Sequence, residues 1–90
     1  YLIDNQFIKL FLLILRLSRV YPNPGEGQLR IKTSVESAVL HVYDAQGRLV
    51  ITLPFSLEAV VPTGNWAQGI YVWEIWDGTN KVATGKWVKN

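Results

Sequence analysis

The final stretch of the sequence, residues 69–90, constrains the fold most, because it is typical of two β-strands joined by a tight turn. Residues 69–76 are rich in β-branched and aromatic side chains, which fit a pleated sheet better than a helix. Asp77 and Gly78 follow, and this pair is a strong hairpin signal because glycine tolerates a positive φ angle. The return segment, residues 81–89, sets lysines among apolar residues, as edge strands often do. A hairpin alone is marginal in water, so the preceding residues must supply more strands.

Length and composition indicate one globular domain without disulfides. Of the 90 residues, 49% are hydrophobic and 12% are aromatic, which is enough to fill a small core. The nine basic and seven acidic residues are spread along the chain, so we expect no nucleic-acid partner, which would need a concentrated basic face. The absence of cysteine excludes disulfides and thiolate metal sites but leaves export possible.

Residues 1–18 differ from the rest, because an uninterrupted apolar run at 10–15 lies between Lys9 and Arg16. A membrane-spanning helix needs about 20 apolar residues, so we expect no stable membrane span. Three interpretations stay open: a remnant of a signal peptide, a helix or strand that covers apolar surface, or an artefact of expression or gene assignment. Because the sequence begins with Tyr1, we expect a processed product or a fragment.

From Arg19 onward, short strands alternate with turns. Residues 20–27 must be extended and then turn, because each proline pushes the preceding residue out of the α region. Gly47 lies where a three-residue hairpin loop needs a left-handed residue. We expect strands at 28–33, 38–43, 49–53 and 55–61, with Pro54 ending the third of these and residues 62–69 forming a loop.

These patterns predict an all-β fold, a small antiparallel Ig-like β-sandwich of about seven strands over residues 19–90. The apolar residues 1–18 form a short N-terminal segment ahead of it.

Catalytic and metal-binding constellations are missing from the sequence. His41 is the sole histidine, and its place in a strand puts it beside Tyr43, so we interpret it as a surface residue. The carboxylates lack the spacing of a hydrolase pair, and Asp44 and Asp77 lie in turns, where aspartate is common. We therefore predict that the chain is not an enzyme and uses no cofactor or metal.

Four tryptophans raise the alternative of an Ig-like carbohydrate- or protein-binding module, since aromatic rings stack on sugars. Trp73 and Trp76 lie on opposite faces of their strand, so the strand cannot present both to one ligand. We interpret one as core and the other as cover for a surface or interface.

Four short motifs carry a resemblance to a known family. They are Tyr21-Pro22-Asn23-Pro24, then Val42-Tyr43-Asp44-Ala45-Gln46-Gly47-Arg48-Leu49-Val50, then Gly69-Ile70-Tyr71, and last Gly85-Lys86-Trp87-Val88-Lys89-Asn90 at the end of the sequence. Each motif is weak alone. Their order and spacing resemble the C-terminal sorting domain of the type IX (Por) secretion system, over residues 19–90. Trp66 departs from the family, which usually has a smaller aliphatic residue there.

The resemblance implies an Ig-like sandwich fused behind an exported cargo, which would precede residue 19. It implies recognition by the outer-membrane translocon or its shuttle, frequent removal by a cell-surface sortase, and localisation at the outer membrane, at the cell surface or outside the cell. The recognition residues that it implies are Gly69, Tyr71, Gly85, Lys86, Val88 and Lys89. The residues that it implies to be mainly architectural are Tyr21, Pro22, Asn23, Pro24, Asp44, Gly47 and Arg48.

The terminal strand can be interpreted in two ways. It is either a solvated edge whose lysines discourage aggregation, or a free edge whose unpaired backbone groups a receptor uses for strand addition. The order of the motifs favours the second interpretation. We expect backbone pairing to give affinity, and Tyr71, Lys86 and Lys89 to give selectivity.

Overall fold

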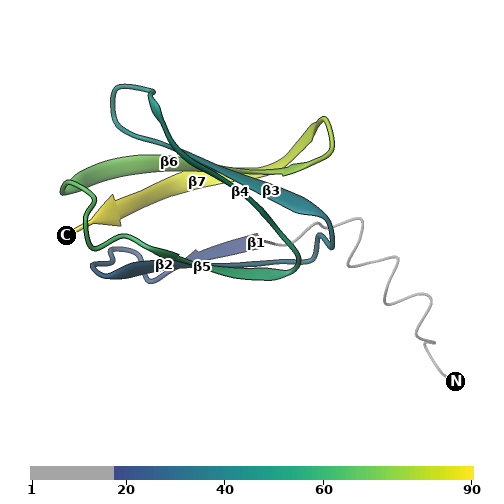
Figure 1. The fold of residues 1–90 in the computed structure, drawn as a ribbon, viewed down its shortest axis with the longest axis horizontal. Helices are drawn as coiled ribbons and strands as arrows, with labels where there is room; N and C mark the ends of the chain where they lie inside the picture. Colours follow the sequence, from purple (N-terminus) through teal and green to yellow (C-terminus); the bar gives the residue numbers. More distant parts are fainter. Residues whose placement is uncertain (1–17) are drawn as a thin grey trace, which may run out of the picture.

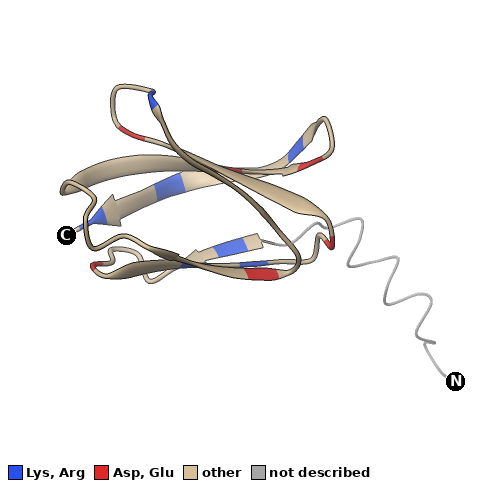
Figure 2. Cartoon of the chain, in the orientation of Figure 1, with Lys and Arg blue, Asp and Glu red and all other residues tan. Residues whose placement is uncertain are grey.

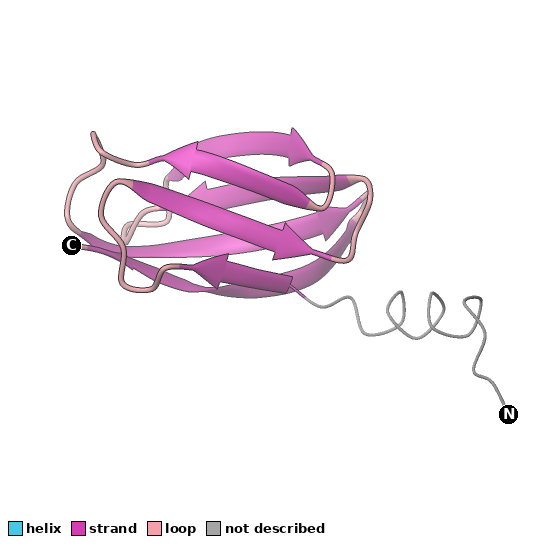
Figure 3. Cartoon of the chain, turned by 90° about the horizontal axis from the view of Figure 1, so that it is seen from below, coloured by secondary structure: helices cyan, strands magenta, loops and turns pink. Residues whose placement is uncertain are grey.

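The computed structural model describes residues 18–90, which fold into two layers of antiparallel strands (Figures 1 and 3). The three-stranded sheet has the order β1-β2-β5 and faces a four-stranded sheet with the order β4-β3-β6-β7. The strands are β1 Ser18–Tyr21, β2 Gln28–Thr33, β3 Ala38–Tyr43, β4 Leu49–Phe55, β5 Glu58–Pro62, β6 Gly69–Asp77 and β7 Asn80–Lys89.

This arrangement confirms the predicted small antiparallel β-sandwich of about seven strands. The interpretations of the apolar run at 10–15 lie outside the described residues. Within residues 18–90, no helix has the length and hydropathy needed to cross a membrane.

The core lies between the sheets and follows the period-two alternation of the strands. In β2, Leu29 and Ile31 are buried while Arg30 and Lys32 between them are exposed, because successive side chains point to opposite faces. β2 and β3 have the predicted bounds. The buried apolar residues are Leu29, Ile31, Val35, Ala38, Leu40, Val42, Val61, Tyr71, Trp73, Ile75 and Trp87.

β4 is longer than predicted, and the expectation that Pro54 ends it is wrong. The strand runs on to Phe55, with Pro54 opposite Val39 of β3. β4 is the outermost strand on its side of the sheet, where a proline is tolerated because its missing N–H need not bond to a neighbouring strand.

The predicted strand at 55–61 is displaced, because β5 begins at Glu58 and includes Pro62. Leu57 has a φ of 64°, a left-handed conformation that ends regular pairing before Glu58. Its backbone is nevertheless fixed, since its carbonyl accepts from the N–H of Thr33 (2.9 Å) and its N–H donates to the carbonyl of Val35 (3.3 Å). The chain crosses from one sheet to the other at this point.

Asp44 closes the loop between β3 and β4. Its Oδ1 accepts from the backbone N–H groups of Gln46 and Arg48 (2.9 Å each), and its Oδ2 accepts from Arg48 Nε (2.8 Å). The bond from the Arg48 backbone is the main cause that lowers the pKa of Asp44. Gly47 has the predicted left-handed conformation, with a φ of 82°. The Asp44, Gly47 and Arg48 motif is thus a self-contained loop.

Candidate recognition surface

β6 and β7 form the predicted terminal hairpin. They pair from Gly69 opposite Lys89 to Asp77 opposite Asn80, and Gly78 takes the positive φ of the turn. β7 is the outermost strand of the four-stranded sheet, which confirms its prediction as an edge strand.

Tyr71 packs into the core and is only 6% exposed. Its hydroxyl donates to the carbonyl oxygen of Ala67, four residues upstream (2.6 Å). A tyrosine near the start of this strand that bonds back to the preceding loop is the tyrosine corner of Ig-like sandwiches. The structure therefore places Tyr71 where it orders the loop before β6, away from the outer surface.

Trp87 is fully buried although it lies between Lys86 and Val88, which are both exposed. Its ring lies 6.1 Å from that of Tyr71 and meets Trp66 edge-on at 6.0 Å. Trp66, where the resemblance implies a smaller aliphatic residue, also lies 5.0 Å from Tyr71. The indole Nε1 of Trp87 donates to the carbonyl oxygen of Pro22 (2.6 Å). This aromatic cluster anchors the end of β7 to the segment that follows β1.

Gly85 makes room for Trp73 on the neighbouring strand. The two residues are register partners, and a Cβ on Gly85 would lie 2.6 Å from the indole ring of Trp73. Gly69 has a φ of 144°, a conformation that strongly favours glycine. Packing explains why position 85 holds a glycine, and backbone conformation explains why position 69 does.

Lys86, Val88 and Lys89 complete the predicted recognition set. Lys86 is exposed and Val88 is 36% exposed. Lys89 is half-buried, and its Nζ donates to the backbone oxygen of Asn90 (3.0 Å). Of the set, these three residues are the ones whose side chains face solvent in part or in full.

Residues 22–25, called the clip below, cover the outer edge of β7 near its C-terminal end. Asn23 Nδ2 donates to the carbonyl oxygen of Lys86 (3.0 Å), and Asn23 Oδ1 accepts from the backbone N–H of Val88 (3.1 Å). The side-chain amide thereby imitates the bonds of a neighbouring strand. Sequence reasoning placed Asn23 among the architectural residues but missed this contact, because its partners lie 63 and 65 positions away.

The backbone of Gly25 continues the clip. Its N–H donates to the carbonyl of Val88 (2.9 Å), and its carbonyl accepts from the N–H of Asn90 (2.8 Å). A Cβ on Gly25 would lie 2.8 Å from the ring of Trp87, so a side chain does not fit. The expectation of unpaired backbone groups at this end of β7 is therefore wrong: the groups are bonded within the chain.

The four tryptophans share no single surface. Trp73 and Trp87 are buried and Trp66 joins the aromatic cluster, whereas Trp76 lies on the outer face of the four-stranded sheet, 6.1 Å from His41. His41 also shares a hydrogen bond with Tyr43 (3.2 Å), as its predicted position implied. The arrangement gives no aromatic platform that would favour a carbohydrate-binding module.

Glu74 is held beside Trp76 on this outer face. Its Oε1 accepts from the indole Nε1 of Trp76 (3.0 Å), and its Oε2 accepts from Lys81 Nζ (3.4 Å). The indole bond is the main cause that lowers the pKa of Glu74, and the charge of Lys81 adds to it. Among residues 18–90, no group of three or more His, Cys, Asp or Glu side chains is placed to hold a metal ion.

A comparison with protein-family models matches residues 19–90 to the secretion system C-terminal sorting domain. The chain belongs to this family. The match covers the two sheets almost completely and agrees with the resemblance drawn from the four motifs. A search of curated proteins finds no match to this chain.

The sorting domain is thus a C-terminal signal of type IX secretion, and its family is not one of enzymes. A protein that carries it is exported across the outer membrane by the type IX machinery.

Proposed function

We propose that the sorting domain delivers its cargo by presenting the β6–β7 hairpin to the outer-membrane translocon or its shuttle. One observation carries this proposal: β7 is an outermost strand, and the side chains of Lys86 and Val88 are exposed on it. The aromatic cluster and the clip hold that strand in a fixed position, and a partner loses less conformational entropy on binding a rigid surface. Removal of the domain by a cell-surface sortase after export is part of the proposal.

Export of a reporter fused ahead of residue 19 in a host with type IX secretion tests the hairpin. Deletion of residues 85–90 would also remove the buried Trp87, so a surface variant is the sharper test. We expect Lys86→Glu with Val88→Asp to leave the reporter in the periplasm. The matched control, Lys32→Glu with Val60→Asp, alters exposed residues on the other sheet and should be exported normally. Equal export of the two variants would overturn the proposal.

The sortase step has a separate readout. In a host without the sortase, the exported reporter should keep the domain, and its mass should exceed that of the reporter released by the normal host. If both hosts release a product of the same mass, the sorting domain is not removed by that enzyme.

A further inference from the structure

The C-terminal end of β7, where the clip lies, is poorly suited to strand addition by a partner. There the clip already bonds to the carbonyl of Lys86, to the N–H and carbonyl of Val88, and to the N–H of Asn90. A partner strand would have to break these bonds and dislodge the clip before it could pair. The side chains on the outer face of the hairpin, in contrast, can be reached without any rearrangement.

Those side chains form one exposed face. Ile70 stands opposite Val88, and Val72 stands opposite Lys86, so the four side chains point to the same side of the sheet. That side is the outer one, because Tyr71 and Trp87, which alternate with them, are buried. Ile70 is 50% exposed and Val88 is 36% exposed. Ile70, Val72, Lys86 and Val88 are called the hairpin face below.

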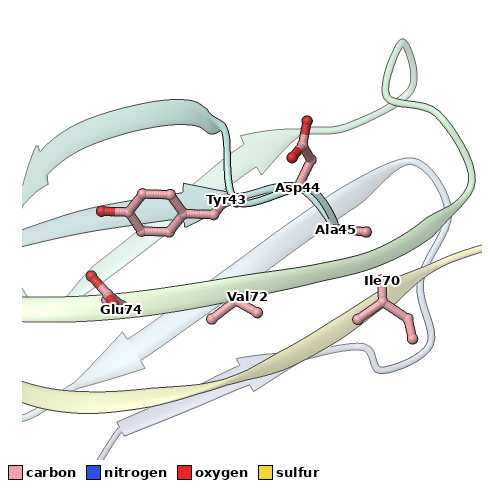
Figure 4. Close-up of a pocket in the computed structure, with 7 residues that line it drawn as sticks. Tyr43, Asp44, Ala45, Ile70, Val72 and Glu74 are labelled. Atoms are coloured by element: carbon pink, nitrogen blue, oxygen red, sulfur yellow. The ribbon is translucent and has the colours of Figure 1, made fainter.

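A hollow of about 530 Å³ adjoins the hairpin face. Tyr43, Asp44, Ala45 and Gly47 line one side of it, and Ile70, Val72 and Glu74 of β6 line the other (Figure 4). Ile70 and Val72 belong to both the hollow and the hairpin face, so the two form a continuous surface. A hollow of this size accepts one or two bulky apolar side chains.

The charges beside the hollow indicate what else a partner must carry. Asp44 is paired with Arg48 at 2.8 Å, and Glu74 is paired with Lys81 at 3.4 Å, so both carboxylates are neutralised. Among residues 18–90, no acceptor lies within bonding distance of Lys86 Nζ. The surface therefore has one surplus positive charge beside its apolar part, and a carboxylate would complement it.

We propose that the hairpin face and its hollow dock a segment of the export machinery that carries a bulky apolar side chain and a nearby carboxylate. The apolar side chain enters the hollow against Ile70 and Val72, and the carboxylate pairs with Lys86. The clip stays in place, and the backbone edge that it covers is not used. This inference rests on the proposed sorting function and replaces backbone pairing by recognition of side chains.

The apolar part is tested by export of the same reporter, fused to the full chain with Ile70→Gln. We expect surface export to fall about tenfold, which corresponds to the loss of about 1.4 kcal/mol of binding free energy. The matched control is Val60→Gln, because Val60 is also 50% exposed but lies in β5 of the other sheet. Circular dichroism and the thermal midpoint of each purified chain verify that the fold is intact.

The charged part is tested by three substitutions of one residue. Lys86→Glu should lower export most, Lys86→Gln less, and Lys86→Arg least, because only arginine keeps the positive charge. A purely structural role of Lys86 predicts equal export of the three variants. Their equality would overturn the charge pairing.

Asn23→Ala frees backbone groups at the end of β7, and together with Ile70→Gln it separates edge recognition from face recognition. Strand addition predicts that this variant is exported at least as well as the parent and that Ile70→Gln has no effect. That pair of results would overturn the inference and leave the sorting function standing. Normal export after deletion of residues 19–90 would overturn both.

Discussion

The two edges of the four-stranded sheet, β4 and β7, differ in how they are protected. β7 carries Lys81, Lys86 and Lys89, and Figure 2 shows its basic positions in blue. The clip bonds to the outer backbone of β7 near its C-terminal end. β4 carries no charge along its whole length, and one proline, Pro54, is its main safeguard against pairing with another chain. The C-terminal end of one edge is therefore covered by a distant part of the chain, and the other edge is protected locally.

This difference shows that the protection of the two edges depends on the folded structure to different degrees. The clip reaches β7 only after residues 22–25 have come together with a strand more than 60 positions away. Pro54 lacks a backbone N–H in the unfolded chain as well as in the folded one, so its protection of β4 does not depend on the fold. The predictions below separate the two edges, beginning with the largest expected effect.

The largest effect should come from Trp87→Ala. Trp87 is fully buried, so its loss should lower the free energy of unfolding by about 3–5 kcal/mol. Phe55→Ala on β4 removes a half-buried ring and should lower it by about 1–2 kcal/mol. Urea unfolding followed by circular dichroism measures both, and equal losses would contradict the idea that β7 is the better-anchored edge.

Gly85→Ala should be next, because the new Cβ would press on the indole of Trp73. Overpacking of this kind lowers the free energy of unfolding by about 1–3 kcal/mol. Gly64→Ala is the control, since nothing lies within 4 Å of the position of its Cβ, and it should change the value by less than about 0.5 kcal/mol. A neutral Gly85→Ala would show that Trp73 can move aside.

Asn23→Ala removes two hydrogen bonds from the clip to β7 and should lower the free energy of unfolding by about 1 kcal/mol. Hydrogen exchange measured by NMR should show faster exchange of the Val88 amide, with little change in β4. Asn65→Ala, in an exposed turn, is the control and should leave both quantities unchanged. If the Val88 amide stayed protected, Gly25 alone would be sufficient to hold the edge.

Acid should weaken the β7 side of the sheet slightly through Glu74. Folding lowers the pKa of Glu74, so the ionised carboxylate stabilises the folded state above its ordinary pKa of about 4.5. This stabilisation is lost as the pH falls through the lowered pKa. Glu74→Gln should remove about 0.5 kcal/mol of stability at pH 7 and reduce the loss between pH 5 and pH 3. Thermal unfolding of both proteins between pH 3 and pH 7 measures the two effects. The same acid dependence in both proteins would exclude Glu74 as a source.

Pro54→Thr should have the smallest effect on stability, within about 0.5 kcal/mol, because β4 already includes this position. It restores an N–H on an uncharged edge and should therefore raise self-association. Sedimentation at increasing protein concentration tests this, with Pro62→Thr as the matched control in β5. A monomer at all concentrations would show that Pro54 is not what protects β4.

Sequence reasoning predicted what depends on local alternation and turns. β2 and β3 have their predicted bounds because their apolar residues alternate, and Gly47 and Gly78 have the expected φ angles. It did not predict that β4 continues through Pro54, because the strand's place at the edge of the sheet depends on the whole topology.

The candidate surface was predictable only in part. The motifs identified the hairpin, and Lys86 and Val88 are exposed on it as a recognition role requires. The burial of Tyr71 and the cover that Asn23 gives to β7 depend on contacts between distant segments, which a period-two pattern does not encode. The hollow beside Ile70 likewise forms only when the β3–β4 loop comes next to β6.

The direction of the clip has a mechanical consequence. Gly25 and Lys89 are bridged in parallel, so a pull on residues before β1 and on Asn90 slides the two segments past each other in shear. Their hydrogen bonds then bear the tension together and do not open one after another. The domain should therefore resist mechanical unfolding when it is pulled at its two ends. The unfolding force is set by the rate at which the junction between the clip and β7 ruptures.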